Sequence, residues 1–336
     1  MRCATLVGVA IAVTFLPARR ASTSAQPAKI GGARVGLVFD VGGRGDKSFN
    51  DSAYEGLARA ERDLGVRVSF LEPVGSEDRE SALRLFAAQG QDLVIAVGFI
   101  FTSDVDAVAR AYPNVHFACV DYAGAEARMP PNVEGLSFRE EEGSFLVGAV
   151  AGLLTRTGHV GFVGGMTIPL IRKFEAGYDA GVHAACPSCV VHSAYAGSTP
   201  DAFKDPARGR SLAAFEVADG ADVLFHASGA TGHGVFEGAR QAGALAIGVD
   251  SDQHDDMPGT VVTSMVKRVD VAVYQAIKDA TAGVFHPGMR VFGLSEQGID
   301  YVHEGPHADG VPGAVKERVE ALRGEVVAGT RHVPSE

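Results

Sequence analysis

The sequence contains no tryptophan, so any aromatic face that stacks on a ligand must come from the 18 phenylalanines or the seven tyrosines. Basic residues are in deficit too: 30 Lys and Arg stand against 41 Asp and Glu, and the formal net charge is −11. A nucleic-acid-binding surface needs a basic stripe, so nucleic acid is not expected as a partner. The 46% hydrophobic content excludes low-complexity disorder. The 336 residues are enough for two domains.

The chain also lacks an apolar run long enough to span a membrane. A shorter run, residues 3–16, follows Met1–Arg2 and precedes a stretch of small residues that ends at Ala25. A charged start, a short apolar run and a small-residue cleavage site are typical of a secretory signal peptide, which we predict for residues 1–25. Cys3 stands too early to be the acylated cysteine of a lipoprotein. We therefore expect a periplasmic protein without a lipid anchor.

Cysteines are few: besides Cys3, the chain has Cys119 and the pair Cys186 and Cys189. Export would permit a disulfide. The pair follows a helical pattern, whereas a thioredoxin-type redox motif precedes a helix, and no second C-x-x-C completes a zinc site. A local disulfide and a pair of free thiols are both compatible with the spacing. Cys119 lies in an apolar run and is expected to be a buried thiol.

Short β-branched apolar runs alternate with longer segments of helical period. The predicted strands are 35–40, 66–71, 93–98, 116–121, 159–164, 190–195, 223–226, 245–250, 261–265 and 290–293. The predicted helices are 49–64, 79–89, 103–111, 140–155, 170–185, 208–218, 234–242, 267–282 and 314–327. Repeated β–α–β units with apolar strands indicate parallel sheets covered on both faces. These strands are too many for one comfortable sheet, so we predict an α/β protein of two doubly wound parallel-sheet lobes.

Three predicted strands end in aspartate, at Asp40, Asp121 and Asp250, and others end in glycine, as at Gly229. In open parallel sheets, ligands bind beyond the carboxyl ends of the strands. A carboxylate there can accept hydrogen bonds from vicinal hydroxyls, and glycine lets the backbone approach a ligand closely. Each aspartate alone could be a turn or helix-capping residue. Together they indicate a cleft for a polyhydroxylated ligand that is uncharged or cationic.

A glycine-rich loop follows the first strand, with the sequence Asp40-Val-Gly-Gly-Arg-Gly-Asp-Lys-Ser-Phe-Asn50. It is not G-x-G-x-x-G, because position 48 is serine, and not a P-loop, because Asp46 replaces the glycine before the lysine. We expect Ser48 to cap the next helix and Phe49 and Asn50 to face the crevice. Phe49 could stack on a heterocycle and Asn50 could pair with its edge. A core position for Phe49 is the alternative.

Enzyme motifs are broken or absent. The segment from His303 to His307 reads H-E-G-P-H and matches the zinc-protease pattern, but Gly-Pro disrupts the helix that would align the two histidines. Residues 251–256, Ser-Asp-Gln-His-Asp-Asp, could ligate a metal, although a solvated acidic turn is the preferred interpretation. No nucleophile elbow is present. We therefore predict no catalytic residue, no metal site and no cofactor.

Four groups of residues, taken in order, resemble one known family. They are Asp46-Lys-Ser-Phe-Asn50 after Asp40; Ser137-Phe-Arg-Glu-Glu-Glu-Gly-Ser-Phe-Leu-Val-Gly148; Gly164-Gly-Met166 with Phe174-Glu-Ala-Gly-Tyr178; and Gly248-Val-Asp-Ser-Asp-Gln253 with Thr263-Ser-Met-Val-Lys-Arg268. Together they resemble the basic-membrane-protein family of ABC-importer substrate-binding proteins, whose characterised members are purine nucleoside receptors. The resemblance covers most of residues 34–285.

The resemblance implies the type I periplasmic-binding-protein fold, in which two α/β lobes joined by three crossovers close on a ligand through a hinge. Carried onto this chain, one lobe would comprise 34–138 and about 257–285. The other would comprise 139–256 and about 286–330.

The resemblance also implies a set of binding residues. Asp250 would hold ribose hydroxyls, Phe49 would stack on the purine, and a second aromatic ring would come from the far lobe, for which our candidate is Phe225. The residues expected to line the cleft are Asp40, Phe49, Asn50, Asp121, Phe225, Gly229, Asp250 and Lys267.

The predicted function is capture of a purine nucleoside by a monomeric periplasmic protein and its delivery to an ABC permease in the inner membrane. An exported nucleoside-acting enzyme is one alternative, and a ligand sensor of the same fold is another. The enzyme would need a general base near the cleft, and only His254 with Asp252 offers one.

Overall fold

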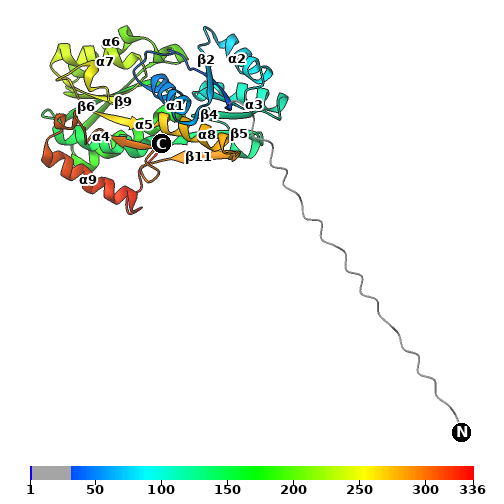
Figure 1. The fold of residues 1–336 in the computed structure, drawn as a ribbon. Coiled ribbons are helices and arrows are strands. Elements are labelled where there is room, and N and C mark those ends of the chain that lie inside the picture. Colours follow the sequence, from blue (N-terminus) through cyan, green and yellow to red (C-terminus); the bar gives the residue numbers. More distant parts are fainter. Residues whose placement is uncertain (2–31) are drawn as a thin grey trace. The chain divides into compact units, whose positions relative to one another are not determined.

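The computed structural model describes Met1 and residues 32–336. Nearly all of the predicted signal peptide, with Cys3, lies outside the described residues. From Gly32 onward the chain forms two sheets covered by helices (Figure 1). Within the described part, no helix combines the length and apolar character needed to cross a membrane.

The first sheet has six strands in the order β2-β1-β3-β4-β5-β11, and all of its pairs are parallel. The strand order reverses direction at β1 and β3, the point at which doubly wound sheets open a crevice for a ligand. Its strands are β1 Arg34–Val38, β2 Arg67–Leu71, β3 Leu93–Val97, β4 His116–Val120, β5 Val133–Phe138 and β11 Gly288–Phe292.

The second sheet repeats this arrangement in the order β7-β6-β8-β9-β10-β12. Its pairs are parallel except for β10 and β12, which run antiparallel. Its strands are β6 His159–Met166, β7 Val190–Gly197, β8 Val223–Ala227, β9 Leu245–Asp250, β10 Val261–Lys267 and β12 Ile299–Tyr301.

Helices cover both faces of each sheet because successive strand residues point to opposite sides. In β1, Leu37 packs in a cluster with Leu57 of α1, whereas Val38 packs with Leu83 of α2. On the second sheet, α6 and α7 lie on one side and α4 and α9 on the other (Figure 1). The helices are α1 Phe49–Leu64, α2 Ser76–Ala88, α3 Thr102–Ala111, α4 Glu140–Leu154, α5 Pro169–Ala185, α6 Pro206–Ala218, α7 Thr231–Ala242, α8 Val269–Thr281 and α9 Gly313–Val327.

The chain crosses between the sheets three times, after β5, after β10 and after β11. We call the first sheet with α1, α2, α3 and α8 the first lobe, and the second sheet with α4, α5, α6, α7 and α9 the second lobe. The expected two-lobe α/β fold is therefore confirmed.

The expected membership of two segments is wrong for one strand in each. Of residues 257–285, expected in the first lobe, α8 packs there on α1, but β10 pairs with β9 in the second sheet. Of residues 286–330, expected in the second lobe, β12 and α9 lie there, but β11 pairs with β5 in the first sheet, where Arg290 Nη1 lies 3.4 Å from Glu134 Oε1. The turn at residues 252–259 is thus a connection inside the second lobe and not a crossover.

Cys186 and Cys189 form a disulfide just after α5, which decides between the two alternatives that the spacing left open. Cys119 is a free, buried thiol in β4, as expected.

Candidate functional site

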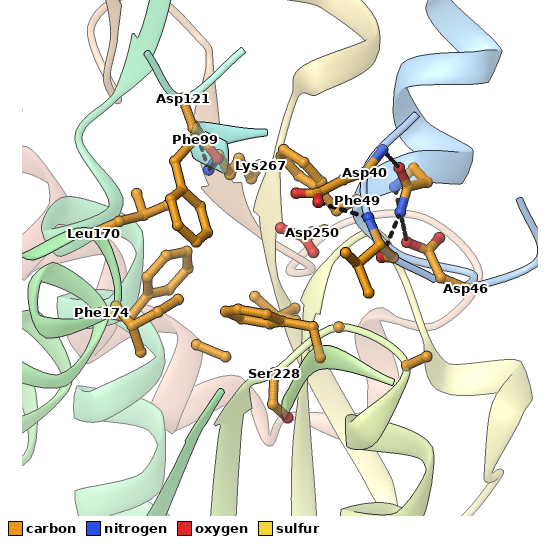
Figure 2. Close-up of a pocket in the computed structure, with 18 residues that line it drawn as sticks. Asp40, Asp46, Phe49, Phe99, Asp121, Leu170, Phe174, Ser228, Asp250 and Lys267 are labelled. Atoms are coloured by element: carbon orange, nitrogen blue, oxygen red, sulfur yellow. Dashed lines mark hydrogen bonds and ion pairs between the residues drawn. The ribbon is translucent and has the colours of Figure 1, made fainter. Parts of the chain in front are cut away.

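A cavity lies where the carboxyl ends of the strands of both sheets meet. The first lobe supplies residues around β1, β3 and β4, and the second supplies residues around β8, β9 and α5. Figure 2 shows Phe99 and Phe174 on one side, Asp40 and Asp46 on the other, and Asp250 between them. The lining residues are Asp40, Val41, Asp46, Phe49, Asn50, Phe99, Asp121, Leu170, Ile171, Phe174, Phe203, Ala227, Ser228, Gly229, Ala230, Val249, Asp250 and Lys267.

The structure brings seven of the eight candidate binding residues to this cavity: Asp40, Phe49, Asn50, Asp121, Gly229, Asp250 and Lys267. The placement of Phe225 was wrong. Its side chain in β8 is fully buried, and its ring lies 5.2 Å from that of Tyr178 and 5.8 Å from that of Phe162. Phe225 therefore belongs to the core under the second sheet.

Asp121 and Asp250 occupy matching places in the two lobes. Asp121 directly follows β4, and Asp250 ends β9; each of these strands is third from the edge in its sheet. Both residues have left-handed backbone conformations, with φ of 58° and 68°. Such conformations are uncommon for residues other than glycine and concentrate at functional sites. The repeated fold thus directs two carboxylates into one cavity from opposite lobes.

Lys267, at the end of β10, neutralises one of these carboxylates. Its Nζ lies 2.8 Å from both carboxylate oxygens of Asp121 and 2.9 Å from Glu140 Oε1. Lys173 Nζ lies 3.1 Å from the other oxygen of Glu140. Burial lowers the pKa of the Lys267 ammonium, but Asp121 and Glu140 outweigh that effect and raise it. Lys267 is thus held as a cation at the back of the cavity.

The other carboxylates are not neutralised in this way. Burial raises the pKa of Asp40 to about 7, an effect that the Val41 N–H only partly offsets. Burial likewise raises the pKa of Asp250 to about 6, against the opposing effects of Lys267 and of the Ser48 hydroxyl, which donates a hydrogen bond to Asp250. A ligand that donates hydrogen bonds to these two carboxyl groups would stabilise their ionised forms.

The glycine-rich loop positions the start of α1. The Asp46 carboxylate accepts hydrogen bonds from the backbone N–H groups of Ser48, Asn50 and Asp51 and from Asn50 Nδ2. Ser48 stands at the N-cap position of α1, as expected, but its side chain makes no capping hydrogen bond, because that hydroxyl reaches Asp250 in the other lobe. Asn50 Oδ1 in turn accepts from the Asp40 N–H at 2.9 Å, so the loop is braced before any ligand arrives.

Four phenylalanine rings line the cavity: Phe49, Phe99, Phe174 and Phe203. Phe99 and Phe203 come from different lobes, and their ring centroids lie 6.4 Å apart in an edge-to-face arrangement. No motif in the sequence marks Phe203, which lies in a short 3₁₀ helix, Pro200–Phe203. A Cβ at position 165 would lie 2.2 Å from the Phe203 ring, so Gly165 provides the space for this ring.

Further contacts hold the lobes together around the cavity. The Lys47 carbonyl of the first lobe accepts hydrogen bonds from Ser251 Oγ at 2.8 Å and from Gln253 Nε2 at 3.2 Å. The Lys47 ammonium pairs with Asp256, and His233 Nε2 donates to the Asp46 carbonyl at 3.1 Å. The described lobes are thus closed on each other.

The cavity offers aromatic faces, carboxylate acceptors and a neutralised lysine, a combination suited to a flat ring that carries hydroxyl groups. His254 and Asp252, the general base that the enzyme alternative requires, are not among its lining residues.

Comparisons with known proteins agree with this geometry. Residues 33–317 match the family model described as "ABC transporter substrate-binding protein PnrA-like". An uncharacterised lipoprotein of Pyrococcus horikoshii is 36% identical over 278 residues, with 80% of this chain and 68% of that protein covered. Basic membrane protein A of Borreliella burgdorferi is 34% identical over 242 residues, with 71% and 70% covered.

Solved structures support the same relationship. A solute-binding protein of an ABC transporter system from Aeropyrum pernix K1 superposes with a TM-score of 0.81 at 31% identity, covering 90% of this chain and 94% of that one. A glucose-galactose-binding protein from Geobacillus stearothermophilus, at 16% identity and a TM-score of 0.56, shares the fold alone. The chain therefore belongs to the Bmp, or PnrA-like, family of ABC-transporter substrate-binding proteins and has the type I periplasmic-binding-protein fold.

Proposed function

We propose that this protein captures a purine nucleoside in the cavity between its lobes and presents it to an ABC permease. One observation supports the ligand class most strongly: two carboxylates of matching position, Asp121 and Asp250, flank a space lined by four phenylalanine rings. A purine needs flat apolar faces, and a ribose needs acceptors for its vicinal hydroxyls.

Phe49 and Phe203 are the rings that we assign to stacking. Phe49 begins α1 in the first lobe, and Phe203 approaches from the second lobe. Both side chains are partly exposed, whereas Phe174 is only 3% exposed and packs in the core. Stacking between rings from opposite lobes would make ligand binding favour the closed state.

The charges of the cavity favour a nucleoside over a nucleotide. Four aspartates line the cavity: Asp40, Asp46, Asp121 and Asp250. The cation of Lys267 is already paired with Asp121. Among the described residues that line the cavity, no unpaired cation would neutralise a phosphate, which would be costly in a buried site.

We propose that the protein acts outside the cytoplasm, after export by the segment 1–25. The name of the Pyrococcus relative describes a lipoprotein, which agrees with an extracytoplasmic location for the family. Binding without chemical conversion agrees with the substrate-binding family to which the chain belongs.

Calorimetric titration with inosine, guanosine and adenosine tests the ligand class. We expect saturable binding of at least one of them at micromolar concentration or below, and much weaker binding of its 5′-monophosphate and of free ribose. Binding of none of the three below millimolar concentration would contradict the nucleoside proposal. Chromatography of the titrated sample should return the nucleoside intact, and release of the free base would favour the enzyme alternative.

A further inference from the structure

We propose that His254, His307 and Asp255 form a binding site for a divalent transition-metal ion, Zn²⁺ being the ion that they fit best. The site lies on the second lobe, outside the cavity described above. His254 and Asp255 stand in the 3₁₀ turn His254–Asp256 that follows β9, and His307 stands in the loop after β12. The fold therefore joins two segments that are far apart in the sequence.

The donor atoms converge on one point. His254 Nδ1 lies 3.2 Å and His307 Nε2 lies 3.3 Å from the same oxygen, Asp255 Oδ1. The two imidazole rings stack with their centroids 4.2 Å apart and an interplanar angle of 17°. One potential ligand atom from each of the three residues lies within 4.8 Å of the others. Rotation of the two imidazole rings out of their stack would aim both nitrogens at one ion and bring all three ligand atoms to the ~2.0–2.2 Å that zinc requires.

A fourth residue orients one of the ligands. Asp252 Oδ2 lies 2.7 Å from His307 Nδ1, so Nε2 is the ring nitrogen of His307 that faces the Asp255 oxygen. A carboxylate on the far nitrogen of a histidine ligand is the usual support for bound zinc.

The ligand set and the surroundings select the class of metal. Two imidazoles and one carboxylate suit Zn²⁺, Ni²⁺ or Cu²⁺, whereas Mg²⁺ and Ca²⁺ prefer oxygen ligands. His254 and His307 are 26% and 23% exposed at their side chains, and Asp255 is 80% exposed, so water can reach a fourth position. Ser251 and Gln253, just before this turn, contact Lys47, so an ion here would anchor the part of the second lobe that meets the first.

Calorimetric titration of the untagged, EDTA-treated and dialysed chain with ZnCl₂ tests the proposal. We expect one ion per chain with micromolar affinity, and a rise of the thermal unfolding temperature as Zn²⁺ is added. His254→Ala and His307→Ala should each weaken binding at least tenfold, and Asp252→Asn should weaken it about 10- to 100-fold. His183→Ala, which changes a histidine beside a single aspartate on α5, is the matched control and should leave binding unchanged.

Three outcomes would overturn the site. The first is the lack of saturation below millimolar Zn²⁺, which would assign the cluster to proton binding alone. The second is unchanged binding in His307→Ala, which would place the ion elsewhere, as at the His159 and His192 pair. The third is a thiolate charge-transfer band in the Co²⁺-loaded protein, which would show a cysteine ligand. Because no nucleoside is used, these results do not depend on the proposed function.

Discussion

Lys267 Nζ lies 2.8 Å from both carboxylate oxygens of Asp121, and this contact joins the end of a second-sheet strand to the end of a first-sheet strand. Both side chains are buried, and Glu140 completes the cluster. The ion pair thus connects the two lobes at the place where they line the cavity. The cost of removing both charges from water offsets most of the attraction within a buried ion pair, so the pair adds little net stability. Loss of one partner is costly, however, because it leaves the other charge buried and unpaired.

Lys267→Met should therefore destabilise the fold. It leaves the Asp121 and Glu140 carboxylates buried without their cation, and we expect a loss of about 3–5 kcal/mol in the free energy of unfolding, measured by urea denaturation. Lys278→Met, at an exposed position on α8, should change it by less than about 0.5 kcal/mol. Addition of Asp121→Asn to Lys267→Met should recover part of the loss. Equal stability of the two lysine variants would contradict this account.

Asp250→Asn should weaken nucleoside binding while leaving the fold intact. The amide has the same shape, but it accepts fewer hydrogen bonds and cannot be ionised. We expect a loss of about 1–3 kcal/mol in binding free energy, measured by calorimetry. Asp219→Asn, beyond the end of α6, is the control. Unchanged affinity of Asp250→Asn would remove this residue from the binding site.

Phe203→Leu and Phe225→Leu should have opposite profiles. Phe203 lines the cavity, so its loss should raise the dissociation constant for the nucleoside with little change in thermal stability. Phe225 packs against Tyr178 and Phe162, so its loss should lower stability by about 1–3 kcal/mol and leave the dissociation constant nearly unchanged. Binding that depends on Phe225 and not on Phe203 would reverse our assignment of the second stacking ring.

Gly98→Ala should disturb Asp40. Gly98 has a φ of 106°, and a Cβ there would lie 2.0 Å from Asp40 Oδ2. We expect lower thermal stability and weaker nucleoside binding, because the carboxylate must move. Gly65→Ala is a matched control, since Gly65 also has a positive φ, 65°, but open space around it. Gly65→Ala should lower the free energy of unfolding only by the backbone strain, about 1–2 kcal/mol, and should leave nucleoside affinity unchanged.

Glu216→Gln should change how stability depends on pH. Burial, partly offset by the Phe162 backbone, raises the pKa of this carboxyl to about 9 in the folded state, against 4.5 for the free group. Between these values the folded state keeps a proton that the unfolded state releases, so stability falls as pH rises from about 4.5 toward 9. The amide removes this fall and should stabilise the protein at pH 8 by about 1 kcal/mol or more.

Chemical denaturation of wild type and variant at several pH values measures the effect. The exposed Glu317→Gln on α9 should leave the pH dependence as it is. A wild-type stability that stays flat between pH 5 and pH 9 would show that Glu216 does not hold its proton.

Much of the site could be predicted from the sequence because one general rule links strand ends to ligands. The segment 49–64 was assigned to a helix with the bounds of α1, and Asp40, Asp121 and Asp250 follow apolar runs whose carboxyl ends must converge. An apolar run marks a strand, and the residue that ends or follows the run lies at the strand end. This position can therefore be predicted from a few neighbouring residues.

The errors concern properties that are not local. Phe225 and His226 are neighbours on a strand whose residues are all buried, so periodicity does not show which faces the cavity. The lobe membership of β10 and β11 depends on pairing with β9 and β5, including the contact of Arg290 with Glu134 across 156 residues of sequence. The meeting of His307 with His254 likewise depends on how two distant loops fold together.

The late position of β11 in the chain has a consequence for biosynthesis. Residues 288–292 supply the edge strand of the sheet that begins at Arg34, so the amino-terminal lobe stays incomplete until almost the whole polypeptide has emerged. Neither lobe is a continuous piece that a truncated gene could encode. In the export that we propose, a nascent chain of this topology would stay unfinished while it is threaded through a translocation channel, and it would acquire its native form only after release.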